Sequence, residues 1–234
     1  MLRVVTWKWN TPGYRSSYGP AQVNVLRSMV ARHYPDPHEF ICCTDDPTGL
    51  DSRIRFVPLW NDFADLGHPS GPRYPSCYRR LRAFDPDIGQ VFGDRFVSLD
   101  LDCVIVDDLR PLWNRPEAFV GWHGTHARNS FNGSMFLMTA GARPQVWTEF
   151  NPRKSPERAQ RAGYYGTDQA WISCCLGSKE ARWSDADGVL SYRLHVAPAA
   201  GRLLPNARVI FWNGKSDPWG EESQRLDWVR DNWR

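Results

Sequence analysis

Residues 95–109 read RFVSLDLDCVIVDDL, a β-branched apolar run that two carboxylates interrupt. Such a run predicts a strand that is buried on both faces of a sheet covered by helices, as in an α/β fold. Asp100 and Asp102 lie two residues apart, so in extended backbone their side chains would project from one face. Two like charges buried together are costly unless a partner separates them. Mg²⁺ or Mn²⁺ would do so, and both ions keep positions for phosphate oxygens, which predicts a phosphorylated ligand.

A D-x-D triplet also occurs by chance, and Asp-rich strand ends are often only solvated turns. The apolar flanks favour the metal site. VSLDLD at residues 97–102 and VIVDDLRPLW at residues 104–113 resemble the D-x-D region of GT-A fold glycosyltransferases. The resemblance is strongest to the retaining group of glycogenin and the bacterial galactosyltransferases (glycosyltransferase family 8). It implies a Rossmann-like mixed sheet flanked by helices, with Asp100 and Asp102 as metal ligands.

Length and composition limit the class of protein. With 234 residues and 41% apolar content, the chain can form one α/β domain over residues 1–234. The formal charge of +3 is small and the basic residues are dispersed, which argues against a nucleic-acid partner. We expect no integral membrane segment and a cytoplasmic location, because the sequence has no 18-residue apolar run and no signal-peptide pattern.

Cysteine and tryptophan give weaker signals. The six cysteines include two adjacent pairs and form no C-x-x-C, so neither a disulfide framework nor a zinc site is indicated. Twelve tryptophans are many for this length. Several could line a sugar site by stacking on a pyranose face, although core packing is the better interpretation for any one of them.

The first half of the chain alternates expected strands and a helix, separated by a loop at residues 10–20. Strands are expected at residues 2–9, 40–44 and 54–60, and a helix at residues 21–33. Ligands of such sheets lie at the carboxyl ends of the strands. That places around one crevice, beside the two aspartates, Thr6, Trp7, Lys8, Thr44 and Asp45. A dinucleotide enzyme and a P-loop NTPase are disfavoured, because neither glycine-rich motif is present.

Residues 77–84, CYRRLRAF, predict a helix before the D-x-D strand. In the resembling family this helix carries a basic residue that contacts the nucleotide sugar, and Arg80 aligns with it. A guanidinium fork suits phosphate or ribose hydroxyls. The alternative is that the three arginines form a solvated helix face.

Residues 131–138, FNGSMFLM, resemble the family's Phe-Asn-Ser-Gly strand with Gly and Ser exchanged. We expect Gly133 to let the backbone approach the donor closely. Asn132 can offer both a donor and an acceptor to sugar hydroxyls.

Residues 166–172, GTDQAWI, match the family's Gly-x-Asp-Gln helix start. The resemblance implies that Asp168 holds the donor sugar hydroxyls and that Gln169 lies under the β-face of the anomeric carbon. The alternative is that Thr167 or Asp168 only caps the helix.

Residues 209–219, VIFWNGKSDPW, resemble the family's closing loop, His-x-x-Gly-x-x-Lys-Pro-Trp. Phe211 stands at the position of the metal-binding His and Asp217 at that of the Lys. Phenylalanine cannot bind a metal. The residues that could substitute are Asn213 as an oxygen ligand, Lys215 beside Gly214 at the diphosphate, and His195 as a metal ligand.

These features together predict a metal-dependent glycosyltransferase with Mn²⁺ or Mg²⁺ as cofactor. We expect it to move a hexose from a nucleotide sugar, a UDP-hexose, to a carbohydrate or other hydroxyl acceptor with retention of configuration. Three alternatives remain. A nucleotidyltransferase would need a Gly-rich, Arg-bearing loop, for which residues 10–20 are a weak match. A non-catalytic sugar-binding protein would not explain the D-x-D. An inverting enzyme would need a base such as Glu149 or Asp187.

Overall fold

Seven strands form the main sheet, in the order β3-β2-β1-β4-β7-β6-β8. The computed structural model describes residues 1–10, 18–72 and 74–234, so most of the expected loop at residues 10–20 lies outside it. β1 pairs in parallel with β2 and β4, whereas β7 runs antiparallel to β4 and β6. The strands of this sheet are β1 (Leu2–Lys8), β2 (His38–Thr44), β3 (Ile54–Pro58), β4 (Arg95–Leu99), β6 (Phe119–Trp122), β7 (Asn132–Thr139) and β8 (Ala181–Trp183).

A second, three-stranded sheet has the order β5-β10-β9. Its strands are β5 (Cys103–Ile105), β9 (Val189–Ser191) and β10 (Val209–Phe211). The α-helices are α1 (Pro20–His33), α2 (Gly89–Phe92), α3 (Arg110–Trp113), α4 (Gln145–Thr148), α5 (Ser155–Arg161), α6 (Asp168–Leu176), α7 (Glu221–Gln224) and α8 (Asp227–Asn232). Shorter turns of helix are the 3₁₀ helices η1 (Tyr78–Phe84), η2 (Asp185–Asp187) and η4 (Ala197–Ala199) and the π-helix η3 (Tyr192–Val196).

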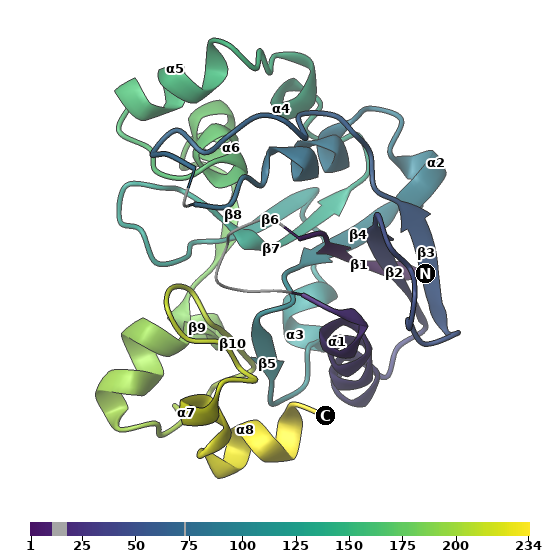
Figure 1. Ribbon diagram of the computed structural model, residues 1–234, viewed down its shortest axis with the longest axis vertical. Coiled ribbons are helices and arrows are strands. Elements are labelled where there is room, and N and C mark those ends of the chain that lie inside the picture. Colours follow the sequence, from purple (N-terminus) through teal and green to yellow (C-terminus); the bar gives the residue numbers. More distant parts are fainter. Residues whose placement is uncertain (11–17, 73) are drawn as a thin grey trace.

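The main sheet lies between two apolar layers, as Figure 1 shows. α1, α3, α8 and the small sheet pack on one face, and η1, α4 and α6 pack on the other. Because side chains alternate along a strand, Val4 enters the first layer and its neighbour Val5 the second. Cys42 and Cys43 divide between the layers in the same way. A sheet covered on both faces explains why its strands read as nearly continuous apolar runs. This mixed sheet flanked by helices confirms the expected fold class.

The prediction that residues 95–109 contain one continuous strand is wrong. β4 ends at Leu99 in the main sheet, and β5 begins at Cys103 in the small sheet, where it pairs with β10. Asp100 and Asp102 therefore lie in the turn between two sheets. Sequence alone does not reveal this crossing, because both halves of the run are equally apolar.

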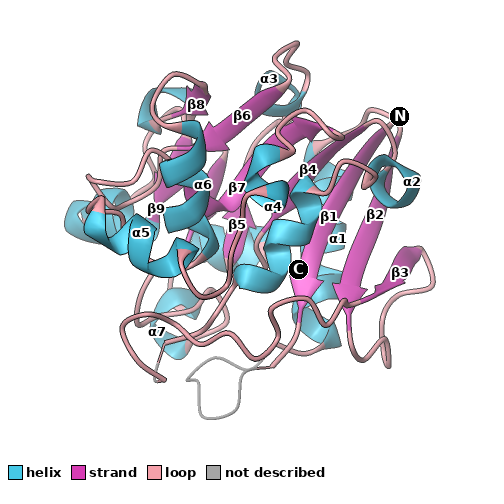
Figure 2. Ribbon diagram, turned by 90° about the horizontal axis from the view of Figure 1, so that it is seen from above, coloured by secondary structure: helices cyan, strands magenta, loops and turns pink. Residues whose placement is uncertain are grey.

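The order of the first four strands creates a point where the chain changes direction. From β1 the chain continues to β2 and β3 on one side and then returns to β4 on the other. Loops that leave such neighbouring parallel strands diverge and open a crevice at their carboxyl ends. Figure 2 shows β1 and β4 side by side. The turn with the two aspartates follows β4, so it lies at this crevice.

No helix in the described part of the chain combines the length and the apolar character needed to cross a membrane. Its six cysteines are free thiols, of which Cys42, Cys43 and Cys103 are buried.

Candidate active site

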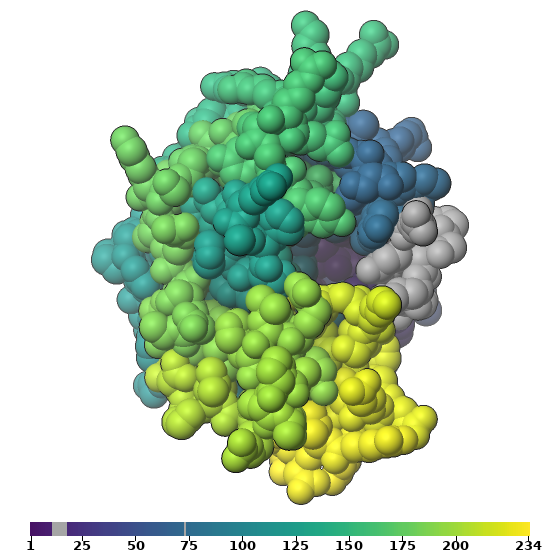
Figure 3. All heavy atoms as spheres, turned by 90° about the vertical axis from the view of Figure 1, so that its left-hand side faces the viewer, coloured from purple at the N-terminus to yellow at the C-terminus, as the bar shows by residue number. Residues whose placement is uncertain are grey.

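A cleft of about 740 Å³ brings together residues from distant parts of the sequence. Its size is in the range of small-molecule sites. Figure 3 shows the hollow between teal and green segments above and the yellow-green carboxyl-terminal segments below. Nine of the residues expected at a site or its metal line the cleft or its floor: Arg80, Asp100, Asp102, Asn132, Asp168, Gln169, Asn213, Gly214 and Lys215.

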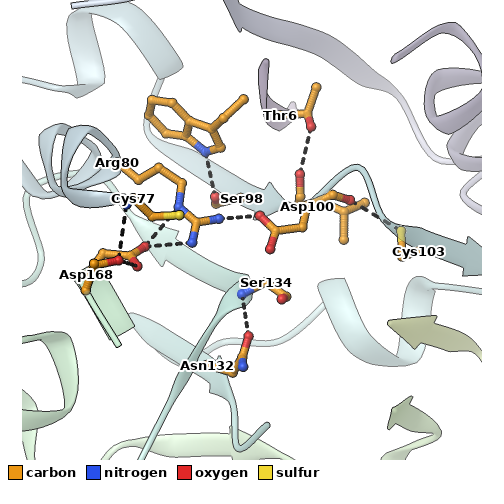
Figure 4. Close-up of polar contacts among 12 residues, drawn as sticks. Thr6, Cys77, Arg80, Ser98, Asp100, Cys103, Asn132, Ser134 and Asp168 are labelled. Atoms are coloured by element: carbon orange, nitrogen blue, oxygen red, sulfur yellow. Dashed lines mark hydrogen bonds and ion pairs between the residues drawn. The ribbon is translucent and has the colours of Figure 1, made fainter. Parts of the chain in front are cut away.

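Arg80 connects two carboxylates at the floor of the cleft (Figure 4). Its Nε donates to Oδ2 of Asp168 at 2.9 Å, and its Nη1 donates to Oδ1 of Asp100. Burial would lower the pKa of Arg80, but the carboxylates of Asp100 and Asp168 outweigh burial and raise that pKa. Arg80 is 7% exposed, so it is not part of a solvated helix face. A fixed cation stands between the expected metal and sugar positions.

The backbone fixes the turn that carries the D-x-D. The amide of Asp100 donates to the carbonyl of Ser134 in β7 at 2.9 Å, and the amide of Trp212 donates to the carbonyl of Asp102 at 2.8 Å. Burial, together with the negative charge of Asp100, raises the pKa of Asp102 well above its ordinary value. Burial also raises the pKa of Asp100, and Arg80 opposes that rise. The two aspartates are therefore unequal, because Asp100 has a cationic partner.

The oxygen donors beside this turn fit a hard divalent cation. Asn213 follows β10 and donates to Oγ of Ser134 at 3.4 Å, while its buried Oδ1 accepts no hydrogen bond from any described residue. Within residues 1–10, 18–72 and 74–234, no three His, Cys, Asp or Glu side chains are grouped as metal ligands. Carboxylates with an amide oxygen are a donor set that Mg²⁺ or Mn²⁺ accepts.

Phe211, at the position of the family's histidine, and His195, the other candidate for the third ligand, both have structural contacts. Phe211 is fully buried and stacks on Trp122, with ring centroids 4.7 Å apart. His195 lies in η3, and its Nδ1 accepts a hydrogen bond from the amide of Ser191 at 2.9 Å. His195 therefore has a local structural role, and Asn213 is the better candidate.

Asp168 and Gln169 begin α6. The N-cap of this helix is Thr167, and no side chain caps the helix by a hydrogen bond. Asp168 is 2% exposed and turned to Arg80, so the helix-cap interpretation is wrong. Gln169 is partly exposed, and its Nε2 donates to the carbonyl of Tyr165 at 3.1 Å.

Gly133 is required by the ion pair beside it. A Cβ atom at this position would lie 2.5 Å from Nη2 of Arg80 and 2.9 Å from Oδ2 of Asp168. We expected Gly133 to let the backbone approach the sugar donor closely. In the structure, the side chains of Arg80 and Asp168 occupy the space beside Gly133. Asn132 lines the cleft, and its Oδ1 accepts the amide of Ser134 at 2.8 Å.

The residues expected from the ends of β1 and β2 take different positions. Thr6 and Trp7 are buried and donate to β4, Thr6 to the carbonyl of Leu99 at 2.8 Å and Trp7 to Oγ of Ser98 at 2.9 Å. Their expected contact with the ligand is not supported, because these side chains join strands within the sheet. Lys8 is 3% exposed at the end of β1, and Asp45 is exposed after β2.

The tryptophans mainly build the core. Trp113, Trp122, Trp171, Trp183 and Trp212 are among the largest fully buried side chains. Trp212 also lines the cleft.

Sequence reasoning missed several residues of the cleft wall. His68, Tyr74 and Tyr165 lie on irregular segments, where no periodic pattern indicates them. Arg193 lies in η3 and Glu222 in α7, and both helices are too short to show a clear period. Thr125 and His126, in the loop after β6, also line the cleft. Glu149 and Asp187 were the bases considered for an inverting enzyme. Glu149 is exposed after α4, and Oδ2 of Asp187 accepts a hydrogen bond from the amide of Ser184 at 2.8 Å in η2 and its N-cap. Neither residue lines the cleft, so neither is positioned as its base.

Comparison with known proteins bears on this fold. No protein-family model and no curated protein sequence matches the chain. Among solved structures, LgtC, a galactosyltransferase crystallised with donor and acceptor sugar analogues, aligns over 97% of this chain and 93% of its own. The TM-score is 0.61 and the identity is 17%. The chain has the fold of a GT-A glycosyltransferase.

Two further glycosyltransferases share the fold over most of this chain. GlyE of Streptococcus pneumoniae TIGR4 has a TM-score of 0.60 and 13% identity, and covers 99% of this chain and 63% of its own. The bifunctional WbbM has a TM-score of 0.57 and 14% identity, and covers 98% of this chain and 48% of its own. These structures confirm the resemblance to GT-A glycosyltransferases, and the chemistry must be argued from the cleft.

Proposed function

We propose that this protein is a metal-dependent glycosyltransferase that moves a hexose from a nucleotide sugar, a UDP-hexose, to a carbohydrate or other hydroxyl acceptor. One observation carries the proposal. Arg80 joins Asp100, beside the expected diphosphate and metal, to Asp168, beside the expected sugar, within one cleft. A nucleotide sugar needs both environments side by side, because the bond that breaks joins the sugar to the phosphate.

The residues of the cleft match the charges that develop in this reaction. Negative charge grows on the diphosphate as it leaves, and Arg80 and Lys215 supply positive charge to stabilise it. Mn²⁺ or Mg²⁺, held by Asp100 and Asp102, would supply further positive charge when bound. Lys8 and Asp45, at the ends of two neighbouring strands, are proposed contacts of the nucleotide.

Asp168, Gln169 and Asn132 would orient the sugar. The bond from the anomeric carbon to the diphosphate oxygen breaks, and a bond to the acceptor oxygen forms. The acceptor proton passes to the leaving phosphate oxygen, so no separate protein base is needed. Asp168 and Gln169 hold the sugar hydroxyls and steady the positive charge that develops on the ring. Transfer would retain configuration if the acceptor approaches from the side that the diphosphate leaves.

The nearest alternative functions differ in their products. Incubation with a panel of UDP- and GDP-sugars and Mn²⁺, followed by mass spectrometry, should show the free nucleoside diphosphate and free sugar, and EDTA should abolish both. A sugar-binding protein without activity would release neither product. A nucleotidyltransferase would instead consume a nucleoside triphosphate and a sugar phosphate and release pyrophosphate.

A further inference from the structure

Four aromatic side chains from three loops lie together on the cleft lining, and we call them the aromatic wall: His68, Tyr74, His126 and Tyr165. His68 lies 5.1 Å from the ring of Tyr74 and 6.1 Å from that of Tyr165, between ring centroids. His126 stacks on Tyr165 at 5.0 Å with an interplanar angle of 12°. The four rings therefore form one connected surface.

Two rings of the aromatic wall are more exposed than most large hydrophobic side chains of this protein. Tyr74 is 38% and Tyr165 42% exposed, and only three other large hydrophobic side chains in the described part of the chain are comparably exposed. Of these, Phe56 is 41% exposed on β3, and it does not line the cleft. Exposed apolar residues that gather beside polar groups mark a binding surface, whereas a single one needs no explanation.

The backbone beneath the exposed ring of Tyr165 is held on both sides. Asn129 is 3% exposed; its Oδ1 accepts the amide of Tyr165 at 2.8 Å, and its Nδ2 donates to the carbonyl of Tyr165 at 2.7 Å. Gln169 donates to the same carbonyl. A ring on a fixed backbone loses little freedom when a ligand covers it, so the wall is preorganised for binding.

The chemistry of the wall suits an uncharged ligand with a flat apolar face. Burial lowers the pKa of His68, although the charge of Asp168 opposes this, so its imidazole is neutral near pH 7. Polar groups line the same cleft, among them Thr125, Arg193 and Glu222. A pyranose has this character, because its C–H faces stack on aromatic rings while its hydroxyls bind polar groups.

We propose that the aromatic wall binds a pyranose ring of a carbohydrate acceptor. The wall has no cation for a diphosphate; the cations expected there, Arg80 and Lys215, lie elsewhere on the cleft lining. Through Gln169 it is next to Asp168, where the donor sugar is expected. The role as acceptor site rests on the proposed function; the binding of a pyranose does not.

Saturation-transfer NMR tests the wall directly. Maltose, cellobiose and lactose are offered to the protein with UDP and Mn²⁺, and we expect saturation on the C–H protons of one pyranose face. Tyr165→Ala should weaken the binding of whichever disaccharide binds by about tenfold, as expected for the loss of one stacked ring. Tyr165→Phe should retain binding, because it keeps the ring. Phe56→Ala is the matched control, since it removes a ring of equal exposure from outside the cleft.

The outcomes separate this inference from the proposed function. Absence of saturation for all three disaccharides, or unchanged binding in both Tyr165→Ala and Tyr74→Ala, would overturn the aromatic wall as a sugar site. Both variants should keep the parent melting temperature, because both rings are exposed. If the parent protein binds a disaccharide but hydrolyses no nucleotide sugar, the wall stands and the proposed transferase fails. If it hydrolyses a nucleotide sugar but binds no disaccharide, the opposite holds.

Discussion

Arg80 and Asp168 form a buried ion pair, with Nη2 and Oδ2 2.8 Å apart, between helices that lie far apart in the sequence. The side chain of Asp168 is 3% exposed and that of Arg80 is 8% exposed. The same guanidinium contacts Asp100, so the position of Asp168, the proposed sugar-binding carboxylate, depends on the D-x-D turn. Loss of Arg80 would leave two buried carboxylates without a cation, and loss of Asp168 would leave Arg80 with Asp100 as its one carboxylate partner among these three; both changes should cost more than the loss of an exposed pair.

Asp168→Asn should lower both stability and turnover. The stability loss should be on the order of 1–3 kcal/mol, because the amide keeps the shape but removes the charge that faces Arg80. Sugar transfer should fall by roughly tenfold or more, since a neutral amide makes weaker hydrogen bonds to hydroxyls than a carboxylate does. Thermal unfolding and a donor-hydrolysis assay measure the two effects.

Asp227→Asn is the control for that experiment. Asp227 pairs with Arg230 in α8, but its side chain is 86% exposed, so its removal should cost no more than about 1 kcal/mol. Parent-like stability and turnover in Asp168→Asn would contradict the coupling through Arg80.

The two aspartates of the D-x-D should respond unequally to amide substitution in metal-free protein. The pKa of Asp102 is raised in the folded state, so the unfolded chain ionises first as pH rises and folding stability falls. Asp102→Asn removes that penalty and should raise the melting temperature at pH 7.5 by roughly a few degrees, with a smaller gain at pH 4. Asp100→Asn should raise the melting temperature less, because Arg80 opposes the rise in the pKa of Asp100 and loses a charged partner in this variant.

Melting curves in EDTA at both pH values check this contrast. A gain for Asp102→Asn that is equal at pH 4 and pH 7.5 would show that the effect does not come from ionisation. A larger gain for Asp100→Asn than for Asp102→Asn would show that the contact with Arg80 does not offset the burial of Asp100.

Gly133→Ala should disturb the site without touching a charged group. The added methyl group would lie 2.5 Å from Nη2 of Arg80, so the ion pair must move; we expect a stability loss of roughly 1–3 kcal/mol and lower turnover. Gly67→Ala is the stability control, because nothing lies within 4 Å of a methyl group there. Equal melting temperatures for the two variants would refute the crowding argument.

Local patterns predicted the elements whose apolar period is strong. The helix expected at residues 21–33 is α1, and the strands expected at residues 2–9 and 40–44 are β1 and β2. Division of residues 95–109 between two sheets could not be predicted, because the choice depends on strands β7 and β10, which lie far along the chain. Local strand propensity carries no information about such distant pairing.

The same limit applies to the cleft. The resemblance implied that Asp100 and Asp168 would lie at one site, with Asn213 as a possible further ligand, and all three line the cleft. The bridge made by Arg80 depends on a distance in space that no spacing encodes. Trp7 was expected to contact the ligand because it lies near the end of a strand. Its side chain instead lies in the same core layer as η1, α4 and α6, where it packs on Phe92. His68 and Tyr165 were missed because loops have no periodic pattern.

Asn213→Ala should weaken Mn²⁺ binding while it leaves the fold intact. Asn213 lines the same cleft as the two carboxylates and its buried Oδ1 has no described hydrogen-bond partner, whereas the methyl group of alanine offers no ligand. Free Mn²⁺, counted by electron paramagnetic resonance with UDP present, should rise by several-fold at a given total concentration. Asn206→Ala is the control, because Asn206 is exposed and donates to the carbonyl of Asp185 away from the cleft.

Phe211→His provides the opposite test, since it places the family's ligand type at its usual position. Phe211 is fully buried against Trp122, so a histidine there would have to leave the core to reach a metal. We expect lower stability, by roughly 2–4 kcal/mol, and no gain in Mn²⁺ affinity over the parent. Two results together would show that Asn213 is not the third ligand: tighter Mn²⁺ binding by Phe211→His, and parent-like Mn²⁺ binding by Asn213→Ala. They would also show that a ligand at position 211 can reach the metal.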